Sequence, residues 1–226
     1  MINLDRISSH TMQSRPFAWA EIDRLFSYQD AAALASSYPL DGFKTVTGYG
    51  GEKNYEYEAR SLVHMGASVP TAPEELSTAW AALAQTLCSA PYRQAMSKLT
   101  GLDLMAVPLE VNIFHYGPGS CLGPHRDLSD KLVTHVLYFN TEWNSADGGC
   151  LNILNSADPA DLKKAVQPLV GNSAVLVRSE ASWHAVTPVV RHSSISRRSL
   201  TATFYRPGSI SSMWTEGDTT PLHRYG

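Results

Sequence analysis

Three residues of this sequence have side-chain types and spacing that suit a metal site. His125 and Asp127 stand two positions apart in the segment GPHRD, and in an extended chain this spacing points both side chains to the same face. His184 heads a β-like run 59 positions after His125, a separation that suits neighbouring strands of a barrel. Two imidazoles and one carboxylate leave part of the coordination sphere open, as non-haem Fe(II) needs to bind an oxo-acid and O₂. The spacing also arises by chance, so the neighbouring segments must support it.

The elements that must position this triad are short strands. From residue 106 onward, β-rich runs alternate with Gly, Pro, Asn and Asp turns, which is typical of a sandwich or barrel. The runs are AVPLEVNIFHY, KLVTHVLYFN, CLNIL, SAVLV, HAVTPVV and SLTATFYR.

The first hundred residues predict supporting helices. FAWAEIDRLF (17–26) and QDAAALASSY (29–38) have apolar residues at helical spacing, and PYRQAMSKLTG predicts a helix that ends at Gly101. Thr71 and Glu74 have the spacing of a capping box before the helix-forming run AWAALAQTLCSA. Residues 42–57 lack a sustained period and predict a loop or an irregular strand pair that covers a site.

Composition limits the class of protein. With 226 residues, 43% of them hydrophobic and 17% charged, the chain can bury the core of one domain. The net charge of −3 includes no basic run for a nucleic-acid backbone, so we expect no nucleic-acid partner. Cys88, Cys121 and Cys150 are odd in number and fit no disulfide or zinc pattern. No apolar stretch suits a signal peptide or a membrane span, so we expect a soluble, cytoplasmic protein.

Four segments together resemble one family. IFHYGPGSCLGPHRD, THVLYFNTEWNSADGGCLNIL, GNSAVLVRSEASWHAVTPV and RRSLTATFY resemble, in order and spacing, the prolyl 4-hydroxylase-like branch of the Fe(II)/2-oxoglutarate dioxygenases. The resemblance implies an α+β fold with a double-stranded β-helix core, that is, a cupin-like jelly roll with N-terminal supporting helices. It implies Fe(II), with 2-oxoglutarate and O₂ as co-substrates, and makes His125, Asp127 and His184 the catalytic metal ligands. We expect one domain over 1–226, with mainly helices and loops over 1–105, the jelly roll over 106–207 and a tail over 208–226.

The resemblance also requires a basic residue after the distal histidine, because a guanidinium can clamp the far carboxylate of 2-oxoglutarate. Arg197 and Arg198 are both candidates, and in a strand only one of them faces inward. The polar face carries Arg197, Ser199, Thr201 and Thr203, and the apolar face carries Arg198, Leu200, Ala202 and Phe204. We therefore favour Arg197, with Ser199 as a second donor. Because RHSSIS lengthens the connection from His184, Arg198 stays an alternative.

Five further residues are candidates with alternative explanations. Tyr138 matches a tyrosine that binds the same carboxylate in relatives, and Leu151 matches an apolar wall of the co-substrate pocket, but both also suit a plain core. Tyr116 and Asn112 share a strand face that looks into the site in relatives, where they would touch substrate, although Tyr116 also suits a strand edge. Trp183 would either wall the pocket or plug the end of the barrel.

The resemblance implies an oxidoreductase that hydroxylates its substrate and releases succinate and CO₂. Since Asp127 fills the third protein position, hydroxylation is favoured over halogenation, while desaturation, ring formation and demethylation stay open. We expect a small-molecule substrate from biosynthesis, amino-acid-like or natural-product-like, because the chain is short. The alternatives are a protein or peptide side-chain hydroxylase and, in another class, a non-redox cupin-like metal-binding protein. The sequence names neither the carbon oxidised nor the oligomeric state.

Overall fold

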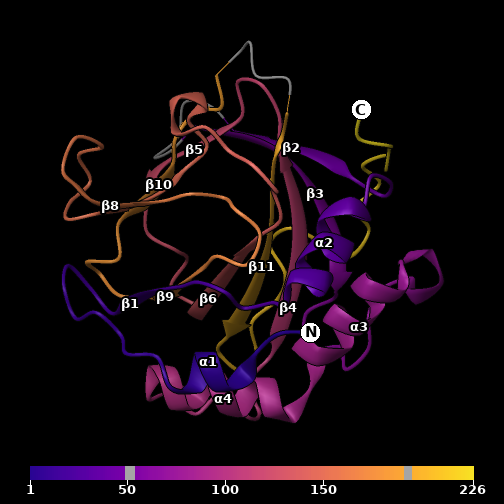
Figure 1. Cartoon of the computed structure of the whole chain (residues 1–226), viewed down its shortest axis with the longest axis horizontal. Coiled ribbons are helices and arrows are strands. Elements are labelled where there is room, and N and C mark those ends of the chain that lie inside the picture. The colour runs from indigo at the N-terminus through magenta and orange to yellow at the C-terminus, as the bar shows by residue number, and fades with distance from the viewer. Residues whose placement is uncertain (49–53, 191–194) are drawn as a thin grey trace.

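The strands of this protein curl into a nearly closed jelly-roll barrel (Figure 1). The computed structural model describes residues 1–48, 54–190 and 195–226. Within these ranges one antiparallel sheet has the strand order β1-β9-β6-β11-β4-β3-β5-β10-β7-β8, and β2 pairs with β3. The strands are β1 (Trp19–Ile22), β2 (Lys44–Gly48), β3 (Tyr55–Val63), β4 (Leu109–Tyr116), β5 (Cys121–His125), β6 (Lys131–Tyr138), β7 (Leu151–Leu154), β8 (Leu162–Val166), β9 (Ser173–Val177), β10 (His184–Val186) and β11 (Arg197–Tyr205). No helix of the described ranges is long and apolar enough to cross a membrane.

In the part of the chain that the structure describes, four α-helices lie beside the barrel (Figure 1). They are α1 (Leu4–Ser8), α2 (Tyr28–Ser36), α3 (Thr78–Cys88) and α4 (Ala90–Thr100). The aromatic side chains of Trp80 and Tyr92 are fully buried where α3 and α4 meet the outer face of the sheet. A second apolar cluster lies inside the barrel and includes Phe114, Val136 and Leu176. The outer core therefore anchors the sheet, and the inner cluster surrounds the space where a site can form.

Strand alternation in β11 separates these two environments. Leu200, Ala202 and Phe204 belong to the outer core with the helices. Arg197 and Ser199 lie on the opposite face, inside the barrel. Because neighbouring side chains of a strand point to opposite faces, this one strand both anchors the fold and supplies polar groups to the interior.

The helix predicted for residues 17–26 is wrong. Trp19–Ile22 form β1, which pairs with β9 from Trp19 opposite Leu176 to Ile22 opposite Ser173. The apolar residues at helical spacing are nevertheless buried, because Phe17, Leu25 and Phe26 flank the strand as core residues. Pairing with a distant strand, which a local pattern cannot represent, overrides the helical signal.

The predicted capping box at the start of the helix over AWAALAQTLCSA is also wrong. Glu74 lies in a short 3₁₀ turn, η1 (Pro73–Glu75), and α3 begins after Ser77, whose hydroxyl accepts a hydrogen bond from the Trp80 amide. Ser77 satisfies the exposed amides of the first turn as an N-cap does. The end of α4 at Gly101 is confirmed, since Gly101 has φ 72°, which glycine adopts without strain.

The six predicted β-rich runs all contain strands, whereas β5 and β8 lie outside them, and β8 carries no apolar pattern because most of its residues are exposed. Residues 42–57 contribute to β2 and β3, which agrees with the predicted alternative of a strand pair. Residues 49–53 of this range lie outside the described residues. Part of RHSSIS, 191–194, lies outside them as well. Three strands in 1–105 show that this region builds part of the sheet in addition to supplying helices.

A buried histidine under α4 predicts acid sensitivity of the fold. His135 is fully buried, shares a 2.9 Å hydrogen bond with the Tyr92 hydroxyl, and has its pKa lowered from 6.5 to about 3 by burial. The unfolded chain therefore binds a proton at a higher pH than the folded chain, and the contribution of His135 to stability, complete above pH 6.5, is lost as the pH falls towards 3. At pH 4.5 the loss is on the order of 3 kcal/mol.

Denaturant unfolding at pH 7.5 and pH 4.5 measures this loss. His135→Gln keeps a hydrogen-bonding group for Tyr92 and cannot gain a proton, so its stability should fall less than that of the wild type between the two pH values. An equal fall in both proteins would contradict the assignment to His135.

Candidate metal centre

The two histidines of the predicted triad lie side by side at the mouth of the barrel. His125 ends β5 and His184 begins β10, and the register of these antiparallel strands places the two residues opposite each other. Their ring centroids are 4.3 Å apart. The Nδ1 atoms lie 2.9 Å from the carbonyl oxygens of Gly123 and Ser182, so each Nδ1 carries the proton and donates it. This tautomer puts the lone pair of both rings on Nε2.

Asp127 completes the cluster, and one donor atom from each of the three residues lies within 4.8 Å of the others. The carboxylate is 9% exposed and accepts hydrogen bonds from Lys131 Nζ at 2.7 Å and Thr134 Oγ1 at 3.0 Å. Burial raises the pKa of Asp127, but the Lys131 ammonium and the neighbouring histidines outweigh burial and hold it well below its usual range. The carboxylate is therefore ionised and oriented, which fits a ligand of a divalent metal.

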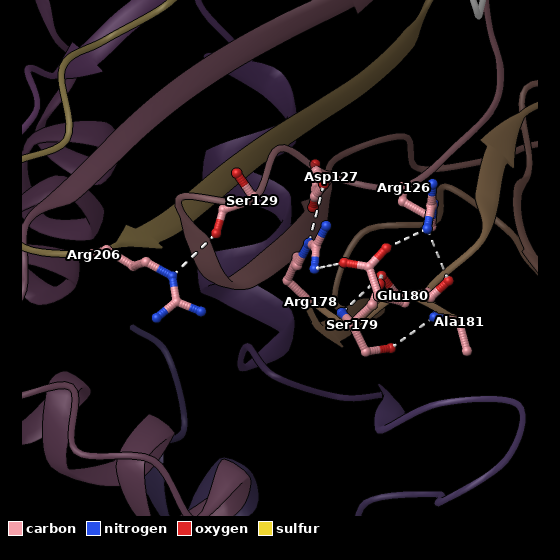
Figure 2. A network of polar contacts seen from close by, with 9 residues as sticks. Arg126, Asp127, Ser129, Arg178, Ser179, Glu180, Ala181 and Arg206 are labelled. Atoms are coloured by element: carbon pink, nitrogen blue, oxygen red, sulfur yellow. Dashed lines mark hydrogen bonds and ion pairs between the residues drawn. The ribbon is translucent and has the colours of Figure 1, made fainter.

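A surface network joins the two segments that carry the triad (Figure 2). The Glu180 carboxylate accepts hydrogen bonds from Arg126 and Arg178, and Arg178 Nε also donates to the Asp127 carbonyl at 3.4 Å. The Arg126 guanidinium lies 4.7 Å from the centroid of the Trp183 ring. Since the Glu180 side chain is 72% exposed, each ion pair contributes little alone. Together these contacts connect residues 125–127 with the turn before His184.

A cavity of about 360 Å³ extends from the triad into the barrel. Arg197 also lines this cavity and is 2% exposed, and its Nη1 donates to Ser199 Oγ at 2.7 Å. Its guanidinium lies 4.8 Å from the Tyr116 ring centroid and 5.2 Å from that of Tyr138. Arg198 points out of the cavity and packs over Tyr38. Of the two candidates, only Arg197 lines the space shared with the triad.

Two buried polar atoms beside this guanidinium have no hydrogen-bond partner among the described residues. They are Arg197 Nε and the Tyr138 hydroxyl. Burial raises the pKa of Tyr138, although the charge of Arg197 opposes this effect, so the hydroxyl stays protonated. Leaving buried donors unpaired costs free energy, and an anionic acceptor with two oxygens would satisfy both. The donor set therefore fits a carboxylate.

The other sequence candidates separate into two groups. Leu151, Tyr116 and Asn112 line the cavity with the triad, but Tyr138 and Trp183 do not: Tyr138 is buried beside Arg197, and the Trp183 ring packs against Arg126. None of these placements assigns a role in binding, and their roles stay predictions.

Several residues that line the cavity were not predicted from the sequence. Thr134 lies an even number of positions from Tyr138 in β6, and Tyr205 lies an even number from Arg197 in β11. Strand alternation alone could therefore have predicted that both line the cavity. Lys131 lies beyond an irregularity in strand pairing, and Met213 lies outside any strand. No local signal identifies these two.

Comparison with known proteins shows what the part of the chain that carries this site is similar to. Residues 111–205 match the family described as the 2OG-Fe(II) oxygenase superfamily. Over 103 residues the chain is 27% identical to prolyl 3-hydroxylase OGFOD1 of Xenopus laevis, and this match covers 44% of the chain but only 20% of that protein.

Two solved structures share the fold. A prolyl-4-hydroxylase of Pseudomonas putida is 21% identical, with a TM-score of 0.58, over 90% of this chain and 96% of the other. A prolyl hydroxylase of Trichoplax adhaerens, solved with a peptide fragment of the hypoxia inducible factor oxygen degradation domain, is 14% identical, with a TM-score of 0.56, over 90% and 87%.

These findings overturn the prediction of a small molecule as the substrate partner. The short chain suggested a small ligand, but the curated relative is a prolyl 3-hydroxylase, and the Trichoplax enzyme of similar fold was solved with a peptide. Chain length is a poor guide here, because a substrate peptide needs only a cavity open to the surface and no further recognition domain.

Proposed function

We propose that this protein is a 2-oxoglutarate-dependent dioxygenase that hydroxylates a side chain of a protein or peptide, because residues 111–205 match the 2OG-Fe(II) oxygenase superfamily and the curated relative is a prolyl 3-hydroxylase. The family uses Fe(II), 2-oxoglutarate and O₂. The observation that carries the proposal is one cavity lined by both the His125–Asp127–His184 triad and Arg197, where Arg197 Nε and the neighbouring Tyr138 hydroxyl are buried without a hydrogen-bond partner among the described residues.

The triad would hold the iron through Nε2 of His125 and His184 and through the carboxylate of Asp127. Bound Fe(II) would supply the oxidation of a substrate C–H bond by O₂, coupled to conversion of 2-oxoglutarate into succinate and CO₂. The chain supports this by holding its ligands still. Lys131 and Thr134 orient the two oxygens of Asp127, and backbone carbonyls fix both imidazole tautomers.

Arg197 and Tyr138 would bind the far carboxylate of 2-oxoglutarate. Ser199 already accepts one guanidinium hydrogen bond, which orients Arg197 along the barrel. Leu151 and the inner apolar cluster around this end limit the access of water. In such a dry environment a charge-assisted pair is stronger than in water, so the co-substrate would bind in one orientation.

The residues at the mouth of the cavity favour a substrate side chain that belongs to a protein or peptide. Leu128 lines the cavity and is also 53% exposed, and Val46, Tyr55 and Leu122 lie on the same lining. Leu128 is exposed and the other three residues are half-buried, so they form a partly exposed apolar edge of the kind that can contact a partner. A side chain of a peptide could enter while its backbone stays at the rim.

Succinate release tests this proposal. The iron-loaded protein, with 2-oxoglutarate and O₂, should release more succinate when proline-containing peptides are added, and mass spectrometry should find one added oxygen on a peptide side chain. Free proline and other free amino acids serve as matched small-molecule controls. Succinate release stimulated only by free amino acids, or no stimulation by any peptide in a broad library, would reject a peptide substrate.

A further inference from the structure

The chain beyond the matched domain returns to the catalytic cavity. The family match ends at residue 205, where β11 also ends. Residues 211–218, called the C-terminal segment below, nevertheless bring Ser212 and Met213 into the lining of the cavity that holds the triad. The wall of the site is therefore partly built from residues outside the family match.

Contacts at two points hold the C-terminal segment in place. Trp214 Nε1 donates a 2.7 Å hydrogen bond to Asn112 Oδ1 on β4. Lys44, at the start of β2, donates to the Met213 carbonyl and to the Asp218 carboxylate, and its Nζ lies 4.3 Å from the centroid of the Trp214 ring. Lys44 is only 6% exposed, whereas Asp218 lies on the surface, so the buried ammonium is held mainly by the Met213 carbonyl and the Trp214 ring, and the ion pair with Asp218 is partly open to water.

Asn112, which accepts the hydrogen bond from Trp214, is itself held in place by other residues of the barrel. Asn112 is 4% exposed, and its Nδ2 donates to Glu110 Oε2 at 3.2 Å. The Tyr205 hydroxyl donates to the same oxygen at 3.2 Å. Because the amide nitrogen of Asn112 is directed to Glu110, its oxygen must face the indole. The hydrogen-bond chain therefore runs from the C-terminal segment to the floor of the cavity.

The position of Met213 indicates what the wall contacts. Met213, Trp214, Val46 and Tyr57 each pack against the inner apolar cluster, and Met213 shares the lining of the cavity with Val46 of β2 and Tyr57 of β3. A flexible thioether next to a valine and an aromatic ring forms an adaptable apolar surface. This surface suits an apolar part of a substrate next to the group that is oxidised.

We propose that the C-terminal segment is a wall of the substrate site, in which Met213 contacts an apolar part of the substrate and Trp214 is a positioning residue that holds Met213 there. Only the identity of that substrate as a peptide rests on the function proposed above. The wall itself can be tested without any substrate.

Methyl NMR of the full chain labelled at its six methionines locates Met213 relative to the metal site. Mn(II), compared with diamagnetic Zn(II), should broaden the Met213 methyl signal most strongly, and far more than that of Met96, which is buried among the helices. Asp127→Asn should remove the broadening if it arises from the triad. A Met213 signal that Mn(II) leaves unchanged, while the protein binds Mn(II), would overturn the proposal.

Trp214→Phe separates positioning from folding. It keeps an aromatic ring but loses the hydrogen bond to Asn112, so the broadening of Met213 by Mn(II) should decrease while 2-oxoglutarate binding stays normal. With a substrate peptide, KM for the peptide should rise about fivefold, as expected for one lost hydrogen bond, with KM for 2-oxoglutarate unchanged. Ile210→Ala, at a side chain that is 82% exposed, is the matched control. Unchanged broadening and unchanged peptide KM in Trp214→Phe would refute the positioning role.

The two proposals fail in different ways. If Mn(II) broadens Met213 but no peptide stimulates succinate release or shifts the Met213 signal, the wall is supported and the peptide substrate is rejected. If peptides are hydroxylated but Met213 responds to neither metal nor peptide, the peptide substrate is supported and the wall is rejected.

Discussion

Replacing Arg197 with leucine is expected to weaken 2-oxoglutarate binding by roughly 100- to 1,000-fold, on the order of 3 to 4 kcal/mol. Arg197 is the only arginine lining the cavity within the described residues, and it is almost fully buried beside the unpaired Tyr138 hydroxyl. Without the guanidinium, the far carboxylate of the co-substrate would be buried without a counter-charge. Removing one partner of a buried pair costs more than the pair itself contributes.

The measurement is the visible charge-transfer absorption of Fe(II) and 2-oxoglutarate under anaerobic conditions, titrated with 2-oxoglutarate. Arg198→Leu is the matched control, because Arg198 is the neighbouring residue on the same strand but packs over Tyr38 outside the cavity. Normal 2-oxoglutarate binding in Arg197→Leu together with a loss in Arg198→Leu would reverse the assignment. Thermal unfolding of both variants verifies that each is folded.

Asp127→Asn is expected to lower the affinity for Fe(II) by at least about a hundredfold and to abolish turnover. The substitution keeps the shape of the side chain but removes the negative charge. Lys131 and Thr134 both donate to the Asp127 carboxylate, and an amide can accept from only one side, so its NH₂ group would face a donor. The metal would lose an anionic ligand and gain an unscreened ammonium beside its site.

Calorimetric titration with Co(II), which resists oxidation by air, measures this effect directly. Glu180→Gln removes a carboxylate from the same end of the barrel, but that side chain is 72% exposed and its ion pairs are weak. Metal affinity in this control should change by no more than a few fold. If the two variants lose affinity equally, the metal does not depend on Asp127 in particular.

The strands around the site were predictable because their signals are local. A period of two is imposed by the backbone, so the polar and apolar faces of β11 could be assigned from sequence, and Arg197 lies on the cavity side as the polar face predicted. The same rule would have found Thr134 and Tyr205. The end of α4 at Gly101 was predictable for a similar reason, since a left-handed residue after a helix favours glycine.

Other features depend on partners far away in the chain. Trp19–Ile22 have helical spacing but form a strand, because β9 offers them backbone hydrogen bonds and burial together. Trp183 stands beside the distal histidine and was a candidate wall of the pocket, yet its ring packs against Arg126. No pattern near residue 183 encodes the position of residue 126.

By itself, the sequence predicted the three residues that cluster as a candidate metal site, and it determined the inward face of β11 and the jelly-roll class, because spacing and alternation are properties of short segments. Only the tertiary structure decided that His125 and His184 lie opposite each other, that Lys131 binds Asp127 and that the C-terminal segment lines the cavity. The physical reason is that closing the barrel brings together groups from distant parts of the chain, and their proximity depends on the packing of the whole sheet.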